Sequence, residues 1–275
     1  QRQMCIRDSN LCGFGKSVIQ AVLEGKVEQL VLVNCCDSMR RVYDIVESTG
    51  KCKFLYMLDM PHEDNDCEKV KLAQGIHRLK KAYEKFSGKT FDRSGFLNAF
   101  SHEPVDNQPY IGVLGVRVSG ILEKMIRDNI RMDVENLTCT GGRRLAVIRE
   151  ELEKMEDDAM FLAYADALLS QMPCFRMNNS TRRNRLYLDP NLKGIIYHTI
   201  KFCDYYGFEY ASIKRDIKVP LLKIETDFTS QSAGQLLTRV QAFAETLEGS
   251  EDMDPSKGIS EEIRKKMESG VYYVA

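Results

Sequence analysis

The residues with the clearest chemical potential in this 275-residue chain are its cysteines, because thiols bind metals or act as nucleophiles. The chain has nine of them, at positions 5, 12, 35, 36, 52, 67, 139, 174 and 203. No Cys-x-x-Cys pair of the kind that binds zinc occurs, and the adjacent Cys35 and Cys36 are poorly placed to bind one tetrahedral ion together. A metal site here must therefore gather cysteines from distant segments, which is compatible with an iron–sulfur cluster without diagnosing one.

The number and setting of the cysteines indicate a reducing compartment. Disulfide-rich secreted domains are short and carry even numbers of cysteines, and residues 1–10 lack the apolar stretch of a secretory signal. We therefore predict a cytoplasmic protein with free thiols. Free cysteine is among the most buried residue types, and we expect Cys35, Cys52 and Cys67 to be ordinary thiols.

Several cysteines directly follow predicted strands, at the end of a parallel sheet where ligands bind. Compact apolar runs predict strands at 29–34, 131–137, 194–199 and 219–224. Cys35 and Cys36 follow the first of these strands, Cys139 the second and Cys203 the third. Cysteines that merely filled the core would be expected inside strands or on helix faces. A helix that begins at a thiol also favours the thiolate, which is the form that binds a metal.

Strands alternate with helices along the whole chain, which indicates an α/β fold. Further strands are predicted at 54–58 and 110–118, and helices at 11–25, 38–48, 68–86, 92–100, 119–129, 146–170, from about 203, and 231–248. The alternation occurs on both sides of the polar, proline-bounded segment 104–109. We therefore predict two Rossmann/flavodoxin-like units with mostly parallel sheets and flanking helices. Their predicted limits are 10–105, incomplete at the N-terminus, and 106–250.

The composition excludes several classes of protein. With 39 Lys and Arg against 40 Asp and Glu, the formal net charge is −1, so there is no basic excess for binding nucleic acid. No apolar run approaches the roughly 18 residues that a membrane span needs. Hydrophobic residues make up 43% of the chain, enough for a packed core and too many for a mainly disordered chain. We expect a globular protein that binds neither nucleic acid nor a membrane.

Cys12 lies near the start of the helix predicted at 11–25 and has two interpretations. It is either a further ligand presented by a helix start or a small hydrophobic residue in a loop. The sequence pattern alone does not decide between them.

Two arginine pairs each follow a candidate cysteine by four and five residues. The pairs are Arg40 with Arg41 and Arg143 with Arg144. In one interpretation they contact a phosphorylated ligand or an acidic partner. In the other they lie on solvated helix faces and pair with Asp44 or Glu150.

Six segments of the chain together resemble the 2-hydroxyacyl-CoA dehydratase D-component family, which includes subunits of 2-hydroxyglutaryl-CoA dehydratase and benzoyl-CoA reductase. The segments are 11–26, 34–44, 138–144, 173–178, 197–210 and 220–243. They occur in the family's order from Leu11 to about Leu247. The blocks C-D-S-M-R-R at 36–41 and K-F-C-D at 201–204 are fairly specific when taken together.

The resemblance implies a 4Fe–4S cluster held by three cysteines, which by motif are Cys12, Cys36 and Cys203 here. Cys139 and Cys174 also lie in family motifs and are weaker candidates for contact with the cofactor. The implied reaction is the radical elimination of water from a 2-hydroxyacyl-CoA after one-electron reduction. The cluster would carry that chemistry, and the protein would ligate it, orient the substrate and exclude water and oxygen. The resemblance assigns no catalytic side chain and no acyl group.

The resemblance also implies partners. These are a paralogous subunit or a second copy of the chain, an ATP-dependent activator that delivers the electron, and the acyl-CoA substrate. Two other activities stay open: an ATP-driven reductase subunit of the benzoyl-CoA type, and a cluster-carrying electron-transfer subunit without turnover of its own.

Both ends of the chain depart from the family pattern. Residues 1–9 look like translated sequencing-adapter sequence, so we expect an artefactual leader that includes Cys5, followed by a family segment truncated at its N-terminus. Residues 251–275 form a charged linker, and its final segment 271–275 resembles the lead-in to the family's activator domain. We expect such a domain to be fused downstream in the natural protein.

Overall fold

The computed structural model describes residues 11–98, 108–139, 141, 149–171, 174–177, 183–215, 217–226 and 233–248. The chain divides into two compact units. Unit 1 consists of Gln1–Pro104 with Arg144–Asn179, and unit 2 of Val105–Arg143 with Ser180–Ala275. Each unit is therefore built from two separate segments of the chain, and the segment Arg144–Asn179 belongs to unit 1 by its contacts.

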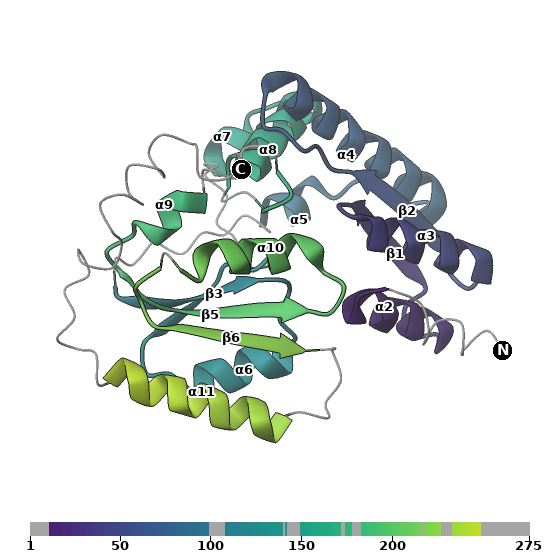
Figure 1. Cartoon of the computed structure of the whole chain (residues 1–275). Helices are drawn as coiled ribbons and strands as arrows, with labels where there is room; N and C mark the ends of the chain where they lie inside the picture. The colour runs from purple at the N-terminus through teal and green to yellow at the C-terminus, as the bar shows by residue number, and fades with distance from the viewer. Residues whose placement is uncertain are drawn as a thin grey trace. The chain divides into compact units, whose positions relative to one another are not determined.

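Unit 1 combines a small parallel sheet with long helices (Figure 1). Its elements are α2 (Gly13–Leu23), β1 (Gln29–Asn34), α3 (Asp37–Thr49), β2 (Phe54–Asp59), α4 (Asp66–Ser87), α5 (Arg93–Asn98), α7 (Arg149–Glu153) and α8 (Asp157–Ser170). The strands β1 and β2 pair in parallel from Gln29 opposite Phe54 to Asn34 opposite Asp59. The apolar core lies mainly among the helices, where Leu72 of α4 packs in one cluster with Met160 and Phe161 of α8.

The helix predicted over 146–170 is wrong in its continuity, because α7 ends at Glu153 and α8 begins at Asp157. Arg93 of α5 explains the interruption. Its guanidinium donates hydrogen bonds to the carbonyl oxygens of Leu152, at 2.9 Å, and of Met155. The same guanidinium pairs with the Asp157 carboxylate at 2.8 Å. Carbonyls at a helix end lack partners within the helix, so this contact stabilises a stop there.

Unit 2 contains a four-stranded sheet within the described residues. Its elements are β3 (Tyr110–Gly115), α6 (Gly120–Asn129), β4 (Asp133–Asn136), α9 (Asn184–Tyr187), β5 (Leu192–Ile200), α10 (Asp204–Ile213), β6 (Leu221–Thr226) and α11 (Ala233–Glu248). The strand order is β4-β3-β5-β6, and each of these described pairs is parallel. Helices α6 and α11 cover one face of the sheet and α10 the other (Figure 1).

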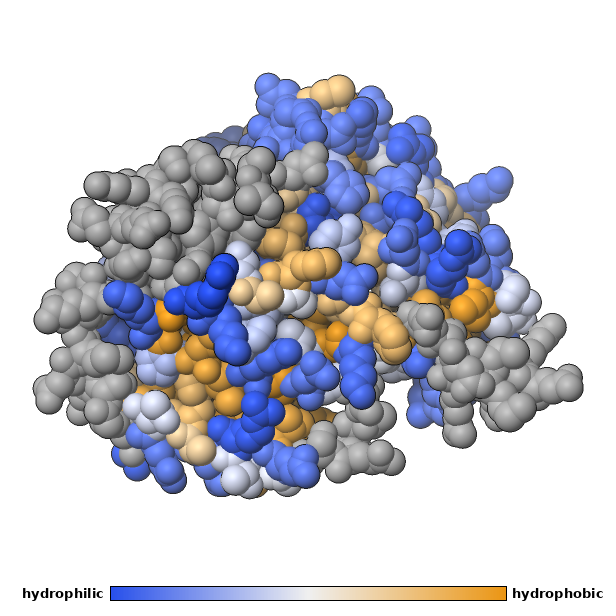
Figure 2. All heavy atoms as spheres, in the orientation of Figure 1, coloured by the Kyte–Doolittle hydropathy of each residue, from blue (hydrophilic) through white to orange (hydrophobic). Residues whose placement is uncertain are grey.

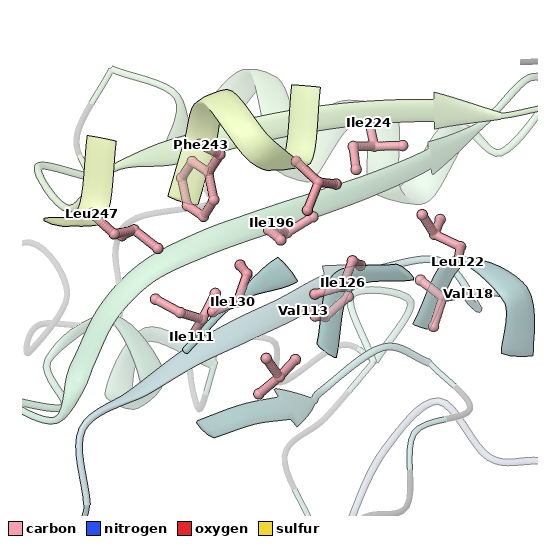
Figure 3. Close-up of a cluster of buried hydrophobic side chains, with 12 residues drawn as sticks. Ile111, Val113, Val118, Leu122, Ile126, Ile130, Ile196, Ile224, Phe243 and Leu247 are labelled. Atoms are coloured by element: carbon pink, nitrogen blue, oxygen red, sulfur yellow. The ribbon is translucent and has the colours of Figure 1, made fainter. Parts of the chain in front are cut away.

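The core of unit 2 lies between the sheet and the helices α6 and α11. Ile111, Ile196 and Ile224 of the strands pack against Ile126 of α6 and Phe243 of α11 (Figure 3). Glycine at position 194 permits this packing, because an added Cβ would lie 2.9 Å from a methyl carbon of Leu247. The alternation of β5 sends Ile196 into this core and Tyr197 toward the opposite face.

The predicted fold class is confirmed: the chain is α/β, with two parallel sheets flanked by helices. The short helix α9 was missed, because four residues are too few to show a helical period. Among the helices that the structure describes, none is both long and apolar enough to cross a membrane.

Candidate functional site

Each of the three cysteines expected to bind the cluster is the N-cap residue of a helix. Cys12 precedes α2, Cys36 precedes α3 and Cys203 precedes α10. Serine, threonine, aspartate and asparagine are the residues usually preferred at this position. The first backbone N–H groups of a helix have no partner within it, so a negative group at an N-cap is stabilised. The three positions therefore suit thiolates.

Cys12 is buried, and its sulfur accepts a hydrogen bond from the Gly15 N–H at 3.4 Å. Gly15 also brings the start of α2 against α3. An added Cβ at residue 15 would lie 2.9 Å from the Val42 Cγ2 and 3.5 Å from the Met39 Cε. Within unit 1, Cys12 and Cys36 therefore begin two helices that pack against each other.

Cys36 is a half-buried cysteine whose thiol has a shifted pKa. Its pKa is lowered to about 6, chiefly by a hydrogen bond from the Cys35 thiol. The nearby N–H groups of Met39 and Ser38 lower the pKa further, although neither meets the geometry of a side-chain cap, while burial raises it. At neutral pH the Cys36 thiol is therefore mostly the thiolate, which is the state a metal requires.

The arginine pair after Cys36 is exposed, and its two members have different partners. Arg40 donates from Nε to the Asn34 Oδ1 at 2.6 Å and pairs with Asp37 at 3.1 Å, so it links the end of β1 to the start of α3. Arg41 pairs with Asp44 at 3.2 Å on the solvated face of α3. Arg143 and Arg144 lie outside the described residues.

In unit 2, two candidate cysteines follow strands on either side of β3. Cys203 follows β5, and Cys139 follows β4 with its N–H bonded to the Gly115 carbonyl at the end of β3, at 3.1 Å. Gly115 has a φ of 94°, and an added Cβ would lie 2.1 Å from the His198 carbonyl oxygen. The chain leaves β3 toward β4 on one side and returns as β5 on the other. Parallel sheets bind ligands at such a switch point.

The turn before Cys203 is unusual in its backbone and its exposure. Phe202 has a φ of 66°, in the left-handed region that a bulky residue rarely adopts. Phe202 and Phe208 are 55% and 71% exposed, and Figure 2 shows light-orange side chains at the surface near α10. Exposed aromatic groups of this kind suit a surface that contacts another molecule.

Cys174 packs against the apolar core of unit 1. Its neighbour Arg176 was not predicted from the sequence to belong to the site. The Arg176 side chain is buried, and its Nη2 donates to the Pro61 carbonyl at 3.0 Å. Its Nη1 has no hydrogen-bond partner among the described residues. Pro61 lies just beyond β2, so Arg176 reaches the carboxyl edge of the sheet that also carries Cys36. In the sequence, the signal for a buried arginine was that this single charged residue lies within the otherwise apolar run Cys174–Met177.

The described residues of neither unit bring three His, Cys, Asp or Glu side chains together as a metal site. Cys12 and Cys36 belong to unit 1 and Cys203 to unit 2. Thiolate donors are nevertheless those that hold iron–sulfur clusters, and the lowered pKa of Cys36 fits that chemistry. The three residues thus fit the implied cluster by donor type.

A hollow of about 410 Å³ lies on unit 1 between α4 and α8. Ala73 and Phe161 line it, together with His77, whose ring pairs with Asp158 at 2.9 Å. None of the candidate cysteines lines this hollow. Position and donor chemistry both favour the helix starts at the carboxyl ends of the strands as the site.

The fold is thus that of an α/β protein with cysteines at three helix starts, two of which follow parallel strands. The model of the family described as 2-hydroxyglutaryl-CoA dehydratase, D-component, matches residues 6–104 and 105–247. The chain therefore belongs to the 2-hydroxyglutaryl-CoA dehydratase D-component family.

Two relatives carry related names. A chain of Escherichia coli (strain K12) named as a dehydratase subunit, YjiM, is 28% identical over 153 residues, which cover 52% of this chain and 39% of the relative. The (R)-phenyllactyl-CoA dehydratase beta subunit of Clostridium sporogenes is 40% identical over 57 residues, which cover 20% of this chain and 15% of the relative. The matched regions thus span less than half of either relative.

Proposed function

We propose that this chain is the iron–sulfur subunit of a 2-hydroxyacyl-CoA dehydratase-like enzyme, a lyase that eliminates water from a 2-hydroxyacyl-CoA. The observation that carries the proposal is the N-cap position of all three candidate ligands, Cys12, Cys36 and Cys203. Membership of the dehydratase family supports the same conclusion.

In this proposal Cys12, Cys36 and Cys203 are the ligands, each at the start of a helix. The bound 4Fe–4S cluster would supply one-electron chemistry for a radical elimination. Cys36 needs to release little or no proton on binding iron at neutral pH, because its pKa is already about 6. The Gly15 N–H, which already bonds the Cys12 sulfur, would stabilise negative charge on that ligand.

The remaining candidate residues have supporting roles in the proposal. Cys139 is tied by its backbone to the end of β3 and would lie near the bound cofactor or substrate. Arg176 carries a buried positive charge at the edge of the unit 1 sheet and would offset the negative charge of thiolate ligands. Arg40 is the better placed arginine of its pair for an anionic ligand, because Arg41 is paired away from the start of α3.

The proposal also includes partners. They are a paralogous subunit or a second copy of this chain, an ATP-dependent activator, and an acyl-CoA. The name of the Clostridium sporogenes relative, a beta subunit, supports a subunit role for this chain. The exposed aromatic residues beside Cys203 offer a surface for one of these partners.

Turnover under anaerobic conditions tests the proposal. The full-length chain, its partner subunit, the activator and ATP are mixed with a panel of 2-hydroxyacyl-CoAs, and 2-enoyl-CoA is measured. We expect the enoyl product with the wild-type chain and loss of nearly all product with Cys36→Ser, while Cys67→Ser serves as a control at an exposed cysteine of unit 1.

Two results would contradict this function. Reduction of benzoyl-CoA in place of dehydration would identify a reductase subunit. If the complete, iron-loaded assembly turned over neither substrate class, the chain would instead be identified as an electron-transfer subunit.

A further inference from the structure

A buried charged cluster lies beneath α10, the helix that begins at Cys203. The Glu209 carboxylate is 0% exposed and the Arg183 side chain 1% exposed, and they form a two-point ion pair. Two tyrosine hydroxyls also donate to this carboxylate, from Tyr187 at 3.1 Å and from Tyr197 at 2.5 Å. Both carboxylate oxygens of Glu209 are thus fully occupied.

This cluster occupies the position where an apolar residue would ordinarily pack. All ten residues of α10 are described, and three of them are buried: Tyr206, Glu209 and Ile213. A buried ion pair adds little stability compared with apolar side chains of the same size. It does require one defined arrangement, because each charge needs its partner in place. The cluster therefore specifies the position of α10 rather than simply adding stability to the core.

The bonds of Glu209 connect both sides of the turn that carries Cys203. Tyr197 lies on β5, before the turn, and Glu209 lies on α10, after it. Between them Phe202 has a φ of 66°. A non-glycine residue in this conformation persists where the surrounding structure holds it there. The Tyr197–Glu209 hydrogen bond is such a restraint, and Arg183 fixes the carboxylate from a third segment.

We propose that Glu209, Arg183 and Tyr197 are positioning residues that hold the Phe202 turn and thereby fix the direction of the Cys203 thiol. This inference rests on the proposed function, in which Cys203 is a cluster ligand. The residues act through the backbone of α10 and do not bind the cluster themselves. Their substitution should disturb the start of α10 more than the rest of unit 2.

A matched pair of variants tests the proposal. Tyr197→Phe removes one hydroxyl from the Glu209 carboxylate and leaves the ring in place. Tyr110→Phe is the control, because Tyr110 is also a buried strand residue whose hydroxyl donates to a carboxylate, that of Asp189 at 3.0 Å, away from the Cys203 turn. Glu209→Gln is a second test variant. Should it fail to fold, Tyr197→Phe, which loses a single oxygen, still decides the outcome.

Two readouts are needed, amide hydrogen exchange in the metal-free chain and the EPR signal of the reduced, iron-reconstituted chain. For Tyr197→Phe we expect exchange at residues 203–207 to be at least threefold faster than in the wild type, with a broadened or lost EPR signal. For Tyr110→Phe we expect both to match the wild type. Equal exchange in the two variants, or an unchanged EPR signal in Tyr197→Phe, would overturn the proposal.

The two readouts also separate this inference from the proposed function. If the wild-type chain binds no iron, Cys203 is not a cluster ligand and the proposed function is contradicted. In that case the exchange comparison still shows whether the Glu209 cluster holds the turn. Bound iron together with equal exchange in the two variants contradicts the positioning role alone.

Discussion

Within the described residues, unit 1 and unit 2 each contain a strand–cysteine–helix connection, and the two connections are held in different ways. In unit 1, Cys36 lies between β1 and α3, and α3 buries the apolar residues Met39, Val42 and Val46. In unit 2, Cys203 lies between β5 and α10, and the residues that α10 buries include the carboxylate of Glu209. Apolar packing positions the first helix start, and a buried ion pair helps to position the second.

The polar contacts near the two cysteines differ in burial accordingly. Around Cys36 the links from Asn34 to Asp59 and from Arg40 to Asn34 are exposed to solvent, where such contacts contribute little. Beneath α10 the ion pair of Glu209 with Arg183 is inaccessible to water. Removing either side chain therefore leaves the charge of the other without compensation. The strand–cysteine–helix connection is thus expected to be sensitive to loss of apolar side chains in unit 1 and to loss of a buried charge in unit 2.

The largest expected effect is that of Glu209→Gln. It leaves the buried Arg183 guanidinium without its counter-charge, which should lower the free energy of unfolding of unit 2 by about 3–5 kcal/mol. Equilibrium denaturation followed by hydrogen exchange of unit 2 peptides measures this. The double variant Arg183→Met, Glu209→Leu removes both charges and should recover most of the loss. A cost below about 1 kcal/mol for the single variant would contradict the buried-charge account.

Met39→Ala gives the corresponding effect in unit 1. It removes a buried side chain between α3 and the start of α2, so we expect a loss of about 2–3 kcal/mol from the cavity and the lost apolar contact. The free energy of unfolding measured on unit 1 peptides checks this value. If Met39→Ala proved neutral while Arg40→Ala did not, polar contacts and not apolar packing would position the start of α3, which would contradict the comparison.

Acid should destabilise unit 2 through His198. Burial lowers the pKa of His198 in the folded chain, so the unfolded chain binds the proton more tightly. Stability is therefore full above the unfolded pKa of about 6.5 and falls as the pH drops toward the lower folded pKa, by at most about 1.4 kcal/mol per pH unit. His198→Gln should flatten the profile between those two pKa values. Stability that rises on acidification across the same range would refute this.

The smallest expected effect is that of Arg40→Ala. Its partners Asn34 and Asp37 are exposed, so the free energy of unfolding should change by no more than about 0.5 kcal/mol. Arg41→Ala, which breaks the exposed pair with Asp44, is the matched control. A loss above 1.5 kcal/mol for Arg40→Ala alone would show that the link between β1 and α3 contributes to the fold of unit 1.

The sequence predicted the strands and the placement of cysteines at their ends, because both follow from local patterns. The run 29–34 gives β1 with its predicted limits, and Cys36 and Cys203 follow β1 and β5 as expected. Cys12 was harder to interpret, since a helix start and a loop look alike in sequence. The structure resolves its local position as an N-cap residue, while its role as a ligand stays a proposal.

Contacts between distant segments could not be predicted in this way. The stop between α7 and α8 depends on Arg93, about 60 residues earlier in the chain. No sequence pattern singled out Glu209, because its partner Arg183 lies 26 residues away. Arg176 was hidden for the same reason, because its contact with Pro61 spans 115 residues. Charged residues became informative once the structure showed which of them are buried.

The most direct test of the account is iron binding by single-cysteine variants of the full chain after anaerobic reconstitution with iron and sulfide. We predict about four irons per wild-type chain, with the cluster signal lost or strongly reduced in Cys12→Ser, Cys36→Ser and Cys203→Ser. Cys52→Ser, at a half-buried cysteine away from the helix starts, should retain it. Bound zinc in place of iron, or unchanged iron in Cys36→Ser and Cys203→Ser, would contradict the central claim.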